Sequence, residues 1–198
     1  MEGVQRLVDG VSSLTDHVDI LFANAGATWV QPFDSHSDES FARVIDLNLK
    51  GVFNTIRAFS PLLRKGGSAE DPSRVLITSS IAASVVAFVG DLGTYSYGAS
   101  KAAVVHLGRM LAVELGPQHI TVNMIAPGFF PTQMCDGIVQ FAGGLEEFGK
   151  CNPLGRVGRA EDIAGAVIYL TSKAGAYING TNIEIDGGYM WARGVMRS

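Results

Sequence analysis

Short apolar segments alternate with longer amphipathic segments along the chain, and this alternation restricts the possible folds more than any other feature. Three segments are apolar almost throughout and are followed by glycine, serine or proline, as expected of strands buried on both faces: 19–23, 74–78 and 121–126. A fourth strand is expected at 183–186, and apolar residues recur at helical spacing at 3–14, 37–63, 96–115 and 160–170. This order predicts an α/β protein with a doubly wound parallel sheet, covered by helices on both faces.

Local signals mark the ends of several of these elements. Ser37 is a candidate N-cap for the helix at 37–63, and Asp38 and Glu39 follow in its first turn. Gly116-Pro117 is expected to end the helix at 96–115. A loop is expected at 66–72, and the weakly patterned segment 129–152 is expected to be irregular.

The 198 residues predict one domain spanning 1–198, because a chain of this length with 47% apolar residues can bury a core. The net charge is −4 and no run of lysine and arginine is present, which argues against nucleic-acid binding. No apolar run is long enough for a membrane span, and the first residues lack the features of a secretion signal. Cys135 and Cys151 are therefore expected to be reduced thiols in the cytoplasm, and the histidines show no metal-binding spacing.

In an open parallel sheet, ligands bind beyond the carboxyl ends of the strands. Three segments with glycine or polar residues directly follow predicted strands: Asn24–Gly26, Ser79–Ser80 and Pro127–Thr132. A candidate binding site is therefore expected where these segments meet.

Tyr97 and Lys101 are four residues apart in the helix at 96–115, so both side chains lie on one face of it. A free tyrosine has a pKa of about 10 and is a poor acid or base near neutral pH. A neighbouring ammonium stabilises the phenolate and lowers that pKa, which suits a general acid or base. The spacing by itself is common, and an ordinary surface pair is the alternative interpretation.

Other polar positions at the strand ends or nearby also have two interpretations each. A hydroxyl at Ser79 or Ser80 can donate to a substrate oxygen, or it can cap a turn. The glycine of Asn24–Gly26 lets a ligand approach the backbone, or it only ends the strand. Asn48 lies among apolar residues of the helix at 37–63, where its amide needs either a structural hydrogen bond or a place in a proton relay.

Taken together, these motifs resemble those of the short-chain dehydrogenase/reductase family, in the family's order and along essentially the whole chain. The motifs that carry the resemblance are Asn24-Ala-Gly26, Asn48 in Asp46-Leu-Asn-Leu, Ser80 after Arg74-Val-Leu-Ile-Thr, Tyr97-x-x-x-Lys101, Pro127-Gly128 with Thr132, Leu154-Gly-Arg-Val-Gly-Arg-Ala-Glu-Asp162 and Ile183-Glu-Ile-Asp-Gly-Gly188. The stretch from Tyr95 to Asn123 is most similar to 3-oxoacyl-reductase-like and polyol-dehydrogenase-like members. The resemblance implies a Rossmann-like fold and an NAD(P)(H)-dependent oxidoreductase that interconverts a ketone and a secondary alcohol.

The resemblance also implies a role for each matching catalytic position. Tyr97 would protonate the carbonyl oxygen of the substrate, and Lys101 would lower the pKa of Tyr97 and hold the nicotinamide ribose. Ser80 would hydrogen-bond the reacting oxygen, and Asn48 would position a water that links Lys101 to solvent. Ser80 holds the family position, with Ser79 as a competitor and Ser84 as a third candidate because its spacing to Tyr97 is closer to the family habit.

Cofactor contacts are implied for Asn24, beside the adenine ribose, and for Phe130 and Thr132, over the nicotinamide and diphosphate. Arg57 matches a further position assigned to cofactor contacts, with an exposed helix arginine as the alternative interpretation. NADP(H) is favoured by resemblance to the ketoreductases, with NAD(H) as the alternative. No metal is implied.

One departure from the family pattern is large. The family's Gly-rich turn, T-G-x-x-x-G-x-G, binds the cofactor diphosphate, and no such motif precedes Asn24. The chain is therefore expected to be N-terminally truncated, without the first strands of the nucleotide-binding portion. The strand at 19–23 would then be an apolar sheet edge, apolar helix faces would lose their cover, and cofactor affinity would be poor or absent.

Two functions are consistent with this pattern. The first is a ketoreductase acting on a small metabolite or on a polyketide- or acyl-type substrate, with the sequence an incomplete version of the active enzyme. The second is a short, catalytically impaired homologue that acts as an interaction partner. Family members pair through two long helices, here 37–63 and 96–115, so the resemblance implies a homodimer or tetramer.

Overall fold

The computed structural model describes residues 2–135 and 144–192, and its strands form one parallel sheet. The strands are β1 (Ile20–Ala23), β2 (Ser73–Thr78), β3 (Ile120–Pro127) and β4 (Asn182–Ile185), and they lie side by side in this order. The register places Leu76 of β2 between Phe22 of β1 and Asn123 of β3. The α/β architecture and the Rossmann-like parallel sheet predicted from the sequence are confirmed.

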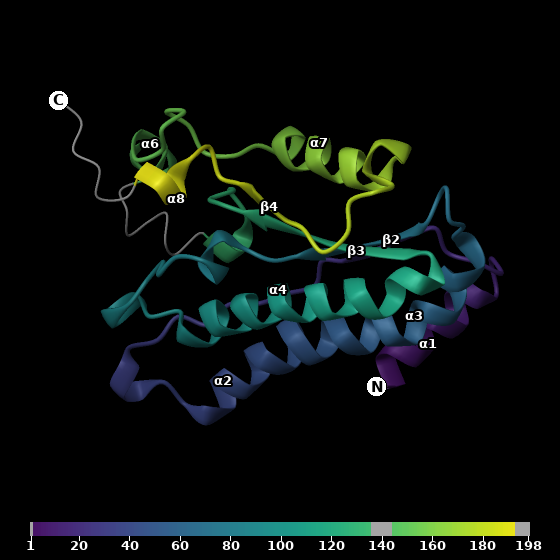
Figure 1. Ribbon diagram of the computed structural model, residues 1–198. Helices are drawn as coiled ribbons and strands as arrows, with labels where there is room; N and C mark the ends of the chain where they lie inside the picture. Colours follow the sequence, from purple (N-terminus) through teal and green to yellow (C-terminus); the bar gives the residue numbers. More distant parts are fainter. Residues whose placement is uncertain (1, 136–143, 193–198) are drawn as a thin grey trace.

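Helices cover both faces of this sheet (Figure 1). One face carries α1 (Glu2–Ser12), α2 (Asp38–Ile45), α3 (Val52–Gly66) and α4 (Tyr95–Leu115). The other side carries α6 (Leu145–Lys150), α7 (Ala160–Thr171) and α8 (Tyr189–Ala192). Because side chains alternate along a strand, Val75 and Ile77 pack toward α3 and α4, whereas Leu76 packs with Leu170 of α7.

The helix predicted at 37–63 is interrupted in the structure. Ser37 caps α2 as expected, since its Oγ accepts a hydrogen bond from the backbone N of Ser40 at 3.2 Å. A π-helical segment (Asp46–Gly51) then separates α2 from α3. Such bulges in helices are rare and are often found at functional sites, and this one contains Asn48.

Further along α3, Pro61 lacks the N–H that would bond the carbonyl of Arg57. The Ser60 hydroxyl donates to that carbonyl at 2.9 Å instead, so the helix continues to Gly66, beyond the predicted end. The helix α4 ends at Leu115 and is followed by a tight turn, Gly116–Gln118, as the Gly-Pro pair predicted.

The weakly patterned segment 129–152 contains more order than its sequence predicted. A short turn at Gln133–Cys135 and the helix α6 lie within it, and residues 136–143 fall outside the described residues. Within the described ranges, no helix combines the length and the apolar character that crossing a bilayer requires.

The strand β1 lies at the edge of the described sheet, as predicted. Leu21 packs into the core toward α3, but Ile20 and Phe22 face the other way and are 50% and 39% exposed. The helix α7, which covers that face, packs over β2, β3 and β4. A strand at the edge of a sheet leaves the backbone groups on its outer side unpaired. When its side chains are also apolar and exposed, it is prone to pair with another chain.

Phe22→Lys is therefore expected to reduce self-association of this chain, because a charge on an edge strand opposes strand pairing between molecules. Light scattering over a concentration series would measure the effect. The control is Leu14→Lys, which removes an 87% exposed leucine outside the strands. An equal reduction by both variants would show that general hydrophobicity, and not the edge, drives association.

Candidate active site

The carboxyl ends of β1, β2 and β3 lead into segments that meet beside the start of α4. Asn24–Ala27 follows β1, Ser79–Ser80 follows β2 and Gly128–Thr132 follows β3. Ser80, Gly128 and Tyr97 line a common pocket of about 120 Å³. The pocket therefore lies at the strand ends at which the sequence predicted a site.

Lys101 is buried within α4, with only 4% of its surface exposed. Its Nζ donates a 2.7 Å hydrogen bond to the carbonyl oxygen of Thr78 and lies 5.6 Å from the centre of the Tyr97 ring. Burial lowers the pKa of Lys101 from 10.5 to about 8, because desolvation disfavours the charged ammonium. The side chain nevertheless remains mainly charged at neutral pH.

The pKa of Tyr97 shifts in the direction opposite to the one expected from the sequence. Burial of the phenol raises its pKa above 10, a hydrogen bond with Ser80 lowers it, and Cys135 raises it slightly. The Lys101 ammonium is directed at the carbonyl of Thr78 and not at the phenol oxygen. Desolvation is the largest cause of the raised pKa, and Tyr97 holds its proton at neutral pH.

Ser80 is the serine that lies beside Tyr97. Its Oγ accepts a 3.1 Å hydrogen bond from the backbone N of Ala82, so its own hydrogen can be directed at Tyr97 or at a ligand. Ser79 is 1% exposed and lies outside the pocket lining, and Ser84 is exposed at the end of the next turn. Of the three candidates, the geometry favours Ser80.

Asn48 holds the segment that follows β1. It is buried, its Oδ1 accepts from the backbone N of Ala27, and its Nδ2 donates to the carbonyl of Ala27 and to Ser100 Oγ, each at 2.9 Å. The Ser100 hydroxyl donates in turn to the carbonyl of Tyr97 at 2.7 Å. These bonds bear out the structural interpretation of Asn48, and the positioning of a water by this residue stays a prediction.

Asn24 joins the same cluster through Thr78. Its Oδ1 accepts a 2.7 Å hydrogen bond from the Thr78 hydroxyl, and the Thr78 carbonyl binds Lys101. Asn24 is exposed and directly follows the carboxyl end of β1. A cofactor contact by Asn24 is consistent with this position.

Arg57 is not brought to this cluster. It is exposed on α3, donates to Asn54 at 3.2 Å, and lies over the Phe53 ring at 5.5 Å. At a rise of 1.5 Å per residue, it lies about 13 Å along the helix axis from Asn48. The geometry gives no support to the predicted cofactor contact and favours the exposed-helix alternative.

Phe130 and Thr132 are the two positions after β3 that were predicted to contact the cofactor, and both contacts stay predictions. The Phe130 ring packs against Gly158 and lines a second pocket of about 360 Å³, on the side of Asp162, while Phe129 lines the pocket with Tyr97. Phe129 also lines the second pocket, so it lies between the two. Thr132 is exposed, with Oγ1 3.5 Å from the Cys135 sulfur, and its cofactor contact stays a prediction.

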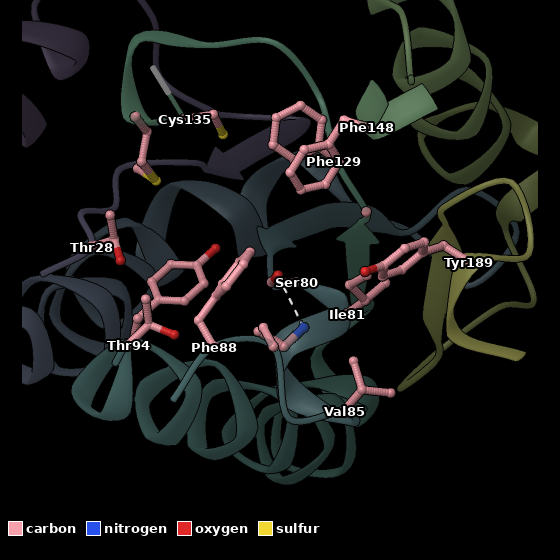
Figure 2. Close-up of a pocket in the computed structure, with 15 residues that line it drawn as sticks. Thr28, Ser80, Ile81, Val85, Phe88, Thr94, Phe129, Cys135, Phe148 and Tyr189 are labelled. Atoms are coloured by element: carbon pink, nitrogen blue, oxygen red, sulfur yellow. Dashed lines mark hydrogen bonds between the residues drawn. The ribbon is translucent and has the colours of Figure 1, made fainter. Parts of the chain in front are cut away.

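Side chains that no motif marked form most of the pocket wall. Figure 2 shows the rings of Phe88, Phe129 and Phe148 around Ser80. The remaining lining residues outside the motifs are Thr28, Ile81, Ala82, Val85, Ala87, Thr94, Met134, Cys135 and Tyr189. The sequence offered only a weak signal for them, namely their position directly after a strand or shortly before Tyr97.

The lowered pKa of Lys101 predicts how stability depends on pH. Between about pH 8 and pH 10.5 the unfolded chain binds more protons than the folded chain at this residue, so stability rises with pH. Over this range, the free energy of unfolding of the wild type should rise by about 3 kcal/mol relative to that of Lys101→Met. Urea denaturation of both proteins at several pH values measures this difference in the free energy of unfolding. The exposed Lys173→Met is the control, and parallel pH profiles for wild type and Lys101→Met would contradict the prediction.

Comparison of the sequence with known proteins gives matches over most of the chain. Residues 1–190 match a family model described as Enoyl-(Acyl carrier protein) reductase. The chain is 42% identical to the rhamnolipids biosynthesis 3-oxoacyl-[acyl-carrier-protein] reductase of Pseudomonas aeruginosa, over 94% of this chain and 72% of that protein.

Solved structures of similar proteins share the fold of this chain. The Pseudomonas aeruginosa RhlG/NADP active-site complex is similar with a TM-score of 0.88 and 41% identity, covering 95% of this chain and 72% of that one. A gluconate 5-dehydrogenase from Burkholderia cenocepacia, in complex with NADP and tartrate, is similar with a TM-score of 0.84 and 27% identity, over 95% and 71%. The matches extend over nearly the whole described chain, including the helix α4 that carries Tyr97 and Lys101. This chain therefore belongs to the short-chain dehydrogenase/reductase family of NAD(P)-dependent oxidoreductases.

Proposed function

We propose that this protein is a ketoreductase, which reduces a ketone to a secondary alcohol with NADPH. The observation that carries the proposal is the convergence of Tyr97, Ser80 and the buried Lys101 at the carboxyl ends of the strands. The similar proteins support the cofactor, since two solved relatives are complexes with NADP. NAD(H) is the alternative cofactor.

The residues of this site fit the ribose of such a cofactor. The Lys101 ammonium has three N–H donors, and the structure pairs one of them with the Thr78 carbonyl. The backbone at Gly26 lies close to this ammonium, since a Cβ there would be 3.5 Å from Nζ and 3.4 Å from Asn48 Oδ1. Lys101, Tyr97 and Asn24 would hold the cofactor, which when bound supplies the hydride.

Reduction adds a hydride to the carbonyl carbon and a proton to the carbonyl oxygen, and the chain itself supplies the proton. Tyr97 holds a proton at Oη at neutral pH because burial raises its pKa, which suits a general acid. Ser80 donates a hydrogen bond to the same carbonyl oxygen and orients it. Lys101, still charged, stabilises the phenolate that remains after the transfer.

Tyr97→Phe removes the transferable proton and should lower turnover by roughly 10²- to 10⁴-fold without changing the fold. The assay follows consumption of NADPH with a panel of ketones, and circular dichroism reports folding. Tyr95→Phe is the matched control, because it removes a hydroxyl two residues earlier on α4, outside the pocket lining. Unchanged turnover in Tyr97→Phe, or none in the wild type, would contradict the proposal and favour the interaction-partner function.

We also propose that copies of this chain associate through α2, α3 and α4. In support, α4 exposes Met110 and Val113, which are 59% and 79% exposed, and α2 and α3 expose Phe41 and Phe53. The helices lie together on one face of the sheet (Figure 1). A cytoplasmic location is proposed as well, supported by the free thiols of Cys135 and Cys151.

Val113→Glu should shift the protein toward the monomer, because a carboxylate would then be buried without a partner in the interface. Sedimentation velocity over a concentration series measures the mass. Val89→Glu, which changes a 61% exposed valine in a loop, serves as the control. A monomeric wild type, or a Val113→Glu variant of unchanged mass, would refute association through α4.

A further inference from the structure

The pocket beside Tyr97 is neutral as well as apolar. Among the described residues that line it, none carries a charged side chain, and the polar groups are the thiol of Cys135 and the hydroxyls of Thr28, Ser80, Thr94, Tyr97 and Tyr189. A carboxylate entering this space would lose its water without meeting a cation. The described lining therefore favours a ligand that is uncharged beyond its carbonyl.

An aromatic pair forms one wall of this pocket. The rings of Phe129 and Phe148 are stacked, with centres 3.9 Å apart and planes inclined by 23°. Phe129 is anchored where β3 ends, because its carbonyl accepts a 3.0 Å hydrogen bond from the backbone N of Gly158. Phe148 comes from α6, so the wall joins two separate parts of the chain.

A third ring comes from the loop that precedes α4. The Phe88 ring lines the pocket near Ser80, together with the stacked pair (Figure 2). The Phe88 carbonyl accepts a 3.3 Å hydrogen bond from the backbone N of Thr94. Val85 and Ile81 add aliphatic surface to the lining. Aromatic and aliphatic groups of the described lining thus lie around the Ser80 and Tyr97 hydroxyls, at which the proposed reaction binds a carbonyl.

We infer that the ketone carries an uncharged alkyl or aryl substituent, and that Phe148 determines the specificity for it. The inference rests on the proposed function, because it assigns a substrate class to the same pocket. The carbonyl is held at Ser80 and Tyr97, and the apolar substituent packs on the stacked rings of Phe129 and Phe148. Polyhydroxylated and carboxylated ketones are disfavoured, since the wall offers them no charged partner.

Equilibrium binding tests this inference without turnover. The probes are butanone, methyl propyl ketone and methyl hexyl ketone, with levulinate, in which a carboxylate replaces the terminal methyl of methyl propyl ketone. Saturation-transfer NMR titration gives each Kd. Affinity should rise by about fourfold per buried methylene until the pocket is filled, and levulinate should bind more weakly than methyl propyl ketone.

Variants of two residues on α6 test whether Phe148 causes the preference for an apolar substituent. Phe148→Ala should weaken binding of methyl hexyl ketone by roughly tenfold, whereas Phe148→Leu should retain most of the affinity. The matched control is Leu145→Ala, which truncates an exposed apolar residue on the same helix, outside the lining, and should bind like the wild type. Circular dichroism confirms that each variant is folded.

The outcomes separate this inference from the proposed function. Levulinate binding as tightly as methyl propyl ketone, or equal affinities in Phe148→Ala and Leu145→Ala, would overturn the inference even if the wild type reduces ketones with NADPH. Affinity that rises with chain length and depends on Phe148 would support it. If such binding occurs without any reduction by NADPH, the ketoreductase proposal fails and the apolar ligand class stands.

Discussion

The hydrogen bond from the buried Lys101 ammonium to the Thr78 carbonyl joins the two elements that make the site. Thr78 is the last residue of β2, and Lys101 lies one turn beyond Tyr97 on α4, so this contact sets the position of Tyr97 against Ser80. Burying the Lys101 ammonium costs free energy, and this cost appears as the lowered pKa of Lys101. The packing of α4 against the sheet offsets it. The arrangement of the pocket follows from this one contact and from the amide of Asn48.

One physical cause accounts for both the protonation of Tyr97 and the character of the pocket. Burial raises the pKa of the Tyr97 phenol, and Tyr97 lines the pocket together with the rings that an uncharged substituent would contact. A phenol that keeps its proton at neutral pH suits reduction, in which it acts as an acid. Burial thus connects the proton that Tyr97 keeps at neutral pH with the apolar lining of the pocket.

Much of the fold could be predicted because it depends on local pattern. The strands β2 and β3 were located to within one residue at each end, and Ser37 was found as a cap. The exposed edge at β1 was expected from the family resemblance, because the family's first strands are not found before Asn24. The π-helical segment at Asn48 could not be predicted, since it accompanies hydrogen bonds to Ala27, a residue distant in sequence. The sequence analysis also missed the rings of Phe88, Phe129 and Phe148. They belong to no motif, and they come together only when the chain folds.

The amino-acid sequence by itself determined the family, the parallel sheet and the polar pair Tyr97 and Lys101, because these depend on residue type, spacing and apolar periodicity. Tertiary structure decided which serine lies beside Tyr97, which of Phe129 and Phe130 faces the pocket, and that Arg57 lies elsewhere. It also decided the sign of the pKa shift of Tyr97. The physical reason is that desolvation and the direction of a hydrogen bond depend on what surrounds a group in space, which helical spacing alone does not specify.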